Sequence, residues 1–182
     1  DALGWSVDAY LGRGCALVDH VDGPTDCDQA RPDINAALTS GDYDVVLTTS
    51  TRKFALDDAD QKAILTQIRD AGSEVIVVRD NPLPTDDAIA CASRIGASAE
   101  DRCGTDESVA LESEHSLAAA ADDLGMPVVD LTDLYCADGF CPAIIGNTRV
   151  YRDSAGHITA TWATTLSRSL GEALRDAMPA GS

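Results

Sequence analysis

The 182-residue sequence is poor in lysine and in aromatic residues, and it has no long apolar run. Lysine occurs only as Lys53 and Lys62, and 31 acidic residues against 13 basic ones give a net charge of −18. A surface of that charge repels nucleic acid and anionic lipid, which argues against both as partners. No run approaches the ~20 apolar residues of a membrane-spanning helix. The length and the 45% hydrophobic share instead predict one domain, spanning residues 1–182, with a buried core.

Metal-site spacing is also missing. None of the six cysteines stands in a Cys-x-x-Cys pair, and the only histidines are His20, His115 and His157, so no metal is expected. The cysteines instead fall in local pairs, which favours three short disulfides formed in an oxidising compartment. Free buried thiols in a cytosolic protein are the alternative, and six cysteines allow ~15 pairings. The local pairs are Cys15 with Cys27, Cys91 with Cys103, and Cys136 with Cys141.

Apolar segments alternate between strand and helix patterns at a period of about 30 residues, which is typical of βαβ units and a parallel sheet. The predicted fold is therefore α/β, a three-layer α/β/α sandwich with a mostly parallel sheet. Strands are expected at 4–11, 44–50, 74–78 and 128–131, and helices at 29–38, 57–71, 105–125 and after Thr159.

The segment 151–159, hereafter the Asp–His loop, carries the most suggestive residues. Asp153 and His157 lie four positions apart with Gly156 between them. A carboxylate beside an imidazole fixes its tautomer and raises its basicity, which is half of a hydrolytic triad. The alternative is a turn aspartate and a surface histidine. The other two histidines are expected at the surface, His115 on a helix between acidic residues.

Ligands of such folds bind beyond the carboxyl ends of the strands. The segments 12–14, 48–52 and 79–81 each follow a predicted strand, so they should gather along that edge. The Asp–His loop precedes the last helix and can reach the same edge. This convergence favours a catalytic role for Asp153 and His157.

Several of these features, taken in order, resemble the SGNH hydrolase superfamily, and in particular the extracytoplasmic SGNH domain fused to the membrane acyltransferase 3 domain of bacteria. They are the Gly14-Cys15 turn, the Thr-rich strand end, the paired cysteines, the Arg-Asp-Asn-Pro segment that follows Val78, and the Asp–His loop. The resemblance extends from Trp5 to Leu170. It implies a flavodoxin-like sandwich.

The resemblance also implies roles for single residues. Asp153 and His157 match the orienting acid and the base, although the family usually has Asp-x-x-His, one residue shorter. Gly14 matches a glycine whose backbone N–H helps form the oxyanion hole. The family usually offers an Asn after the middle strand, and here Thr49 or Ser50 would have to donate instead.

The family's nucleophile lies in a Gly-Asp-Ser block after its first strand, and no Gly-Asp-Ser occurs in this sequence. The first strand and the nucleophile are therefore expected outside residues 1–182 or lost. Ser154, beside the acid, is a poor substitute because of its place in the Asp–His loop.

These features lead to three hypotheses. The first is serine-dependent O-acyl or O-acetyl transfer, or ester hydrolysis, on a cell-surface carbohydrate, without metal or cofactor. The second is a non-catalytic glycan-binding or accessory domain, with Arg52 and Arg79 as ligand-binding residues, that works with a membrane acyltransferase domain of the same chain. The third is a structural spacer. The resemblance places the domain outside the cytoplasm, tethered to the membrane in the full-length protein.

Overall fold

The computed structural model describes residues 5–11, 15–19, 27–54 and 56–178. Its central sheet consists of β1 (Val45–Thr48), β2 (Glu74–Val78) and β4 (Val128–Val129), all parallel, in the order β1-β2-β4. Strand β2 pairs on both sides, so its central residues are almost fully buried. Such burial on both faces is why its sequence is a continuous apolar run.

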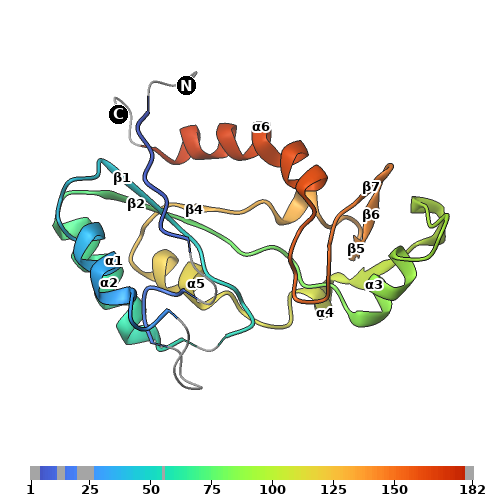
Figure 1. Cartoon of the computed structure of the whole chain (residues 1–182), viewed down its shortest axis with the longest axis horizontal. Helices are drawn as coiled ribbons and strands as arrows, with labels where there is room; N and C mark the ends of the chain where they lie inside the picture. Colours follow the sequence, from blue (N-terminus) through green and yellow to red (C-terminus); the bar gives the residue numbers. More distant parts are fainter. Residues whose placement is uncertain (1–4, 12–14, 20–26, 55, 179–182) are drawn as a thin grey trace.

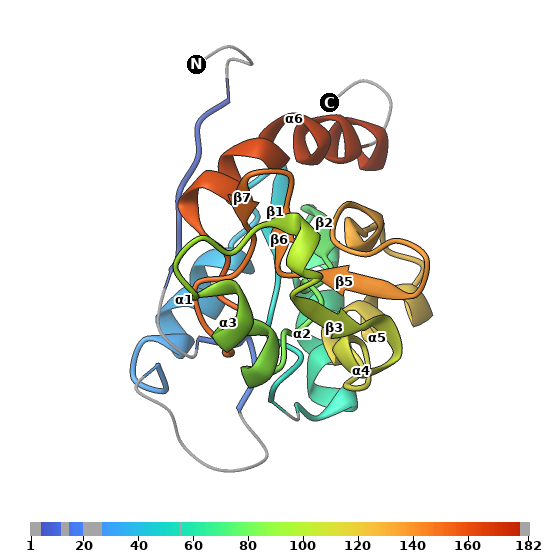
Figure 2. The same ribbon diagram turned by 90° about the vertical axis from the view of Figure 1, so that its right-hand side faces the viewer.

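Helices cover both faces of this sheet, as the α/β sandwich prediction requires (Figure 1, Figure 2). On one side lie α1 (Arg31–Leu38), α2 (Asp58–Asp70) and α5 (Ser116–Asp123), and on the other lies α6 (Ala160–Ala177). The core between the sheet and the first group of helices is apolar and includes Val46, Val75, Val77, Leu65, Ile68, Leu117 and Ala118.

Helix ends follow the side-chain chemistry of the sequence. The Asp57 carboxylate accepts a hydrogen bond from the Asp60 N–H at the start of α2, and Gly72 follows the helix with φ +108°. Thr159 accepts from the Trp162 N–H and starts α6 in the same way. An N-cap of this kind stabilises a helix by about 1 kcal/mol.

A second cluster of elements lies at one end of the molecule (Figure 1). It contains α3 (Asp86–Ala92), the antiparallel pair β3 (Gly104–Asp106) and β5 (Phe140–Pro142), and the hairpin β6 (Ile144–Ile145) and β7 (Thr148–Arg149). Short 3₁₀ turns cover Ala99–Asp101 and Thr132–Leu134. Tyr135, Tyr151 and Trp162 pack together in its core.

The three predicted disulfides are all formed, between Cys15 and Cys27, Cys91 and Cys103, and Cys136 and Cys141. Among the helices of the described residues, none combines the length and the apolarity that crossing a bilayer takes.

Two predicted elements differ from the structure. Residues 5–11 do not form a strand, and Val7 and Leu11 are 76% and 92% exposed, because alternating apolar residues make a strand only where another strand pairs with them. The helix predicted at 105–125 is divided: Thr105 belongs to β3, α4 covers Glu107–Ala110, and α5 starts after His115. Pairing of Thr105 with Cys141 overrides the local helix preference there.

Candidate active site

The Asp–His loop forms the pair that its sequence predicts. The Nδ1 atom of His157 lies 2.9 Å from Oδ1 and 3.0 Å from Oδ2 of Asp153. Backbone N–H groups of Ala155 and His157 also donate to Oδ1, at 3.1 and 3.4 Å. The loop is closed at its base because the Arg152 N–H donates to the His157 carbonyl at 2.7 Å. Contacts within residues 152–157 therefore hold the imidazole against the carboxylate.

The pair is accessible and suited to proton transfer. The His157 side chain is 61% exposed and that of Asp153 38%. Partial desolvation raises the pKa of Asp153, but hydrogen bonds from His157 and Arg152 outweigh it and leave the pKa below its ordinary value. An ionised Asp153 keeps the proton of a neutral His157 on Nδ1, so the lone pair on Nε2 can accept a proton. Within the described residues, no hydrogen bond engages that Nε2 atom.

Contacts with the sheet edge place this loop. The Gly156 carbonyl accepts from Nδ2 of Asn81 at 3.2 Å, and the Ser154 carbonyl accepts from Nζ of Lys53 at 2.7 Å. Asn81 follows β2 and Lys53 follows β1, so the loop reaches the carboxyl edge as predicted. Gly156 has φ +86°, and a Cβ there would lie 2.7 Å from Cδ2 of Leu83. Both its conformation and this close approach require glycine.

The predicted oxyanion donors differ in their surroundings. Ser50 follows β1, is partly buried, and places its Oγ 3.0 Å from Nε2 of His115. Thr49 is exposed, and its hydroxyl donates to the Ser50 carbonyl at 3.4 Å. Gly14 lies outside the described residues. The oxyanion role of all three stays a prediction.

His115 is 1% exposed, so the prediction of a surface histidine is wrong. It lies directly before α5, where its Nδ1 atom accepts from the Asp80 N–H at 3.2 Å. Burial lowers its pKa below the ordinary value of 6.5, and the nearby Asp80 carboxylate opposes the shift only in part. Its partners lie 35 and 65 positions away in sequence, and its neighbours Glu114 and Glu112 are exposed. No local pattern could have identified it.

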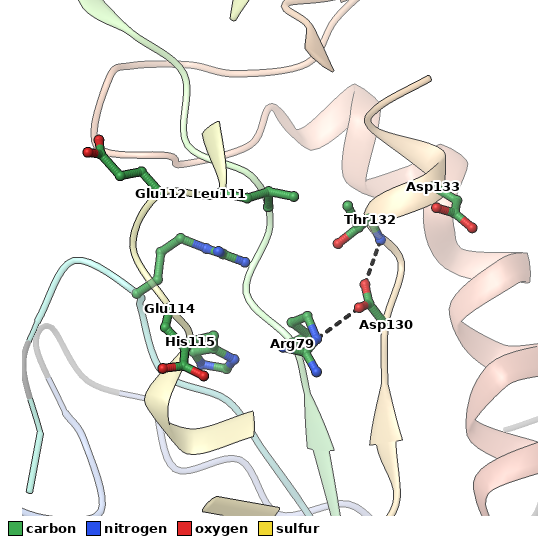
Figure 3. Close-up of a pocket in the computed structure, with 9 residues that line it drawn as sticks. Arg79, Leu111, Glu112, Glu114, His115, Asp130, Thr132 and Asp133 are labelled. Carbon is green, nitrogen blue, oxygen red and sulfur yellow. Dashed lines mark hydrogen bonds and ion pairs between the residues drawn. The ribbon is translucent and has the colours of Figure 1, made fainter. Parts of the chain in front are cut away.

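Arg52 and Arg79 both line a cavity of about 620 Å³ at the same edge. Figure 3 shows Arg79 beside Asp130 in this cavity. Arg52 is 6% exposed, and its guanidinium donates to the carbonyls of Ser113 at 2.9 Å and Asp80 at 2.7 Å. Arg79 forms ion pairs with Asp130 at 2.8 Å and Asp122 at 3.1 Å. Both arginines already have partners within the protein, so a ligand would have to compete for them.

The remaining wall of the cavity is mostly acidic and polar. It is formed by Leu111, Glu112, Glu114, His115, Thr132 and Asp133 together with Asp130. The Asp130 carboxylate also accepts from the Thr132 N–H at 2.9 Å, which orders this wall (Figure 3). Neither Asp153 nor His157 lines the cavity, so the catalytic candidates and the arginine candidates lie in different parts of the edge.

Comparison with known proteins agrees with this fold. The family model for the SGNH domain (fused to AT3 domains) matches residues 1–171. No curated protein matches the sequence. Among solved structures, the periplasmic domain of the lipopolysaccharide acetyltransferase of Salmonella ser. Paratyphi A is similar, with a TM-score of 0.63 and 16% sequence identity. The similarity covers 86% of this chain and 67% of that one, and at this identity it shows a shared fold.

Proposed function

The chain belongs to the family of SGNH domains that are fused to AT3 domains, and on this premise we propose that it carries out acyl-ester chemistry on a carbohydrate outside the cytoplasm. The observation that supports this most directly is the exposed Asp153–His157 pair, with its 2.9 Å contact. The related periplasmic domain belongs to a lipopolysaccharide acetyltransferase, which supports O-acyl or O-acetyl transfer as the reaction and a cell-surface glycan as the acceptor.

In the proposed reaction a serine hydroxyl attacks the acyl carbonyl while Nε2 of His157 takes its proton. Asp153 stabilises the imidazolium that forms, and His157 then returns the proton to the leaving oxygen. A sugar hydroxyl or water next attacks the acyl-serine, with His157 again as the base. Hydroxyls after β1 and the Gly14 N–H stabilise the oxyanion, each donor contributing about 3 kcal/mol. No metal or organic cofactor takes part in this scheme.

The proposal needs a nucleophile, and we assign it to a segment outside residues 1–182. The sequence has no Gly-Asp-Ser block, and in the described part of the chain no serine hydroxyl is hydrogen-bonded to His157. Ser154 shares the loop, but the contact recorded for it is that of its carbonyl with Lys53. Membership of a family whose domains are fused to AT3 domains supports a membrane AT3 domain as the partner that delivers the acyl group.

Fluorophosphonate labelling tests the assignment. The 182-residue chain and the natural full-length protein are exposed to the reagent, and intact mass records one covalent adduct. We expect an adduct on the full-length protein alone, at a serine outside residues 1–182, and its loss in His157→Ala. An adduct on neither protein, together with unchanged acyl transfer in His157→Ala, would contradict the proposal.

A second candidate is a non-catalytic domain that binds a glycan and presents it to a membrane acyltransferase domain. It is favoured by the cavity that holds Arg52 and Arg79 apart from His157. It predicts glycan binding that fluorophosphonate does not affect and that Arg79→Ala abolishes. Arg79 is the better test because Arg52 is buried and joins two loops.

A further inference from the structure

Ser50 and His115 meet at the sheet edge although they are 65 positions apart in sequence. The Ser50 Oγ lies 3.0 Å from Nε2 of His115, and within the described residues no other hydrogen bond to that Oγ is recorded. Arg52 lies at the centre of this region: its N–H donates to the Asp80 carboxylate at 2.9 Å, and its guanidinium donates to the Ser113 carbonyl, two residues before His115, at 2.9 Å. The contact is thus part of an arrangement that joins the loops after β1 and β2 to the segment before α5.

The other ring nitrogen decides which atom of this contact is the donor. Nδ1 of His115 accepts a hydrogen bond from the Asp80 backbone N–H at 3.2 Å. A backbone amide can only donate, so Nδ1 carries a lone pair and no proton. A neutral imidazole then has its proton on Nε2, and Nε2–H donates to the Ser50 Oγ.

This direction leaves the Ser50 proton free. An Oγ that accepts from His115 turns its own O–H away from the ring, toward another acceptor. It also excludes His115 as a base for Ser50, because the facing nitrogen already carries a proton. Ser50 is therefore a poor nucleophile and a good hydrogen-bond donor.

We propose that His115 is a positioning residue, which orients the Ser50 hydroxyl as a hydrogen-bond donor to the oxyanion of the acyl-transfer reaction. This inference rests on the proposed function and deepens it, by choosing Ser50 over Thr49. The consecutive residues Asp80 and Asn81 connect this donor to the Asp–His loop, since the Asp80 N–H donates to His115 and the Asn81 side chain donates to the Gly156 carbonyl. Burial also keeps His115 neutral, as the lowered pKa indicates.

The tautomer can be measured on the 182-residue chain without any activity. Long-range ¹H–¹⁵N spectra distinguish protonated from unprotonated ring nitrogens, and comparison with His115→Asn assigns the signals. At pH 7.5 we expect His115 with a proton on Nε2 and His157 with one on Nδ1. A His115 protonated on Nδ1 in this chain, together with acyl transfer by the full-length protein, would overturn this inference alone.

Kinetics of acyl transfer by the natural full-length protein test the role. Ser50→Ala should lower kcat by about 10²-fold with little change in KM, as expected for a lost oxyanion donor. His115→Asn keeps an acceptor for the Asp80 N–H but lacks the donor to Ser50, so it should lower kcat by about 10-fold. His115→Gln restores a donor near the position of Nε2 and should recover part of that loss.

The double variant separates positioning from structure. Adding His115→Asn to Ser50→Ala should cost nothing further, because the hydroxyl that His115 orients is gone. Ser113→Ala is the matched control, since Ser113 contributes only its backbone carbonyl to Arg52. Additive effects of the two changes would overturn the inference. A wild-type full-length protein without acyl transfer would refute the proposed function and the oxyanion role together, whatever the tautomer.

Discussion

His157 and His115, the two histidines at the carboxyl edge of the sheet, use the same imidazole group in opposite ways. His157 lies in the Asp–His loop, is 61% exposed, and has a carboxylate at Nδ1. His115 is buried to 1% exposure and has a backbone N–H at Nδ1. The partner of Nδ1 thus sets the state of Nε2: an acceptor for a proton in His157 and a donor in His115. Chemistry at one imidazole nitrogen is decided by what touches the other.

The two sites also differ in how they are held. The Asp–His pair is made by residues four apart, and contacts of its loop, with Gly156 against Leu83 and Lys53 on the Ser154 carbonyl, fix where the pair lies. The Ser50–His115 contact joins the segment after β1 to the segment before α5, and the buried Arg52 stabilises it by donating to the carbonyls of Ser113 and Asp80. Changes in the first site should therefore affect activity, while changes in the second should affect stability as well.

The largest effect should come from His157→Ala. Loss of a general base typically lowers kcat by about 10²–10⁴-fold, and the exposed side chain contributes little to packing. We expect that loss in acyl transfer by the full-length protein, with a Tm within about 1 °C of wild type. Asp153→Asn should be impaired in the same direction, because an amide no longer stabilises the imidazolium. More than a tenth of wild-type kcat in His157→Ala would rule out this base.

Gly156→Ala should have the next largest effect. The added Cβ would lie 2.7 Å from Cδ2 of Leu83, and residue 156 has φ +86°, which an alanine rarely adopts. The loop must therefore move, and His157 moves with it. A displacement of about 1 Å can cost 10²-fold in rate, and we expect kcat to fall by about 10- to 100-fold. The matched control is Gly146→Ala, at φ +58° with no atom within 4 Å of the added Cβ. Equal loss of kcat in both variants would show that backbone strain alone, and not the contact with Leu83, matters.

Buried His115 should make the fold sensitive to mild acid. Burial lowers its pKa below 6.5 in the folded state, so below pH 6.5 the unfolded chain binds the proton first. The free energy of unfolding should therefore decrease as the pH falls from about 6.5 toward the folded pKa, by at most about 1.4 kcal/mol per pH unit. Urea unfolding at pH 7.5 and 5.5 should show a smaller decrease in His115→Gln than in wild type. Equal decreases would mean that other groups cause the acid sensitivity.

The smallest effect should come from Lys53→Met. It removes an exposed hydrogen bond from Nζ to the Ser154 carbonyl. Exposed contacts of this kind are weak, so we expect kcat to fall by only roughly two- to five-fold. Lys62→Met is the control: it removes the same charge from a lysine that pairs with Asp58 and Asp123 on helices of the sandwich. A loss of kcat from Lys62→Met as large as that from Lys53→Met would assign the effect to net charge.

Much of the fold could be predicted because its signals are local. Strand β2 has the predicted bounds, 74–78, since four consecutive apolar, β-branched residues after Glu74 suit a strand buried on both faces. The caps Asp57 and Thr159 act within three residues of themselves. The disulfides likewise join cysteines at most 12 positions apart.

The two wrong predictions, a strand at 4–11 and a helix at 105–125, concern elements whose structure depends on partners distant in sequence. Residues 5–11 have a strand pattern, but whether alternating apolar residues become a strand depends on a neighbouring chain. The predicted helix at 105–125 ignored β5, whose pairing with Thr105 comes from 36 residues further on. Local patterns cannot report such partners.

The sequence by itself determined the Asp–His pair, because a carboxylate and an imidazole four residues apart with a glycine between them can close a loop with local contacts alone. Only the tertiary structure decided the state of His115 and the direction of the Ser50 hydroxyl. Those depend on burial and on a single backbone N–H from another strand end, and both exist only once β1, β2 and α5 have packed together.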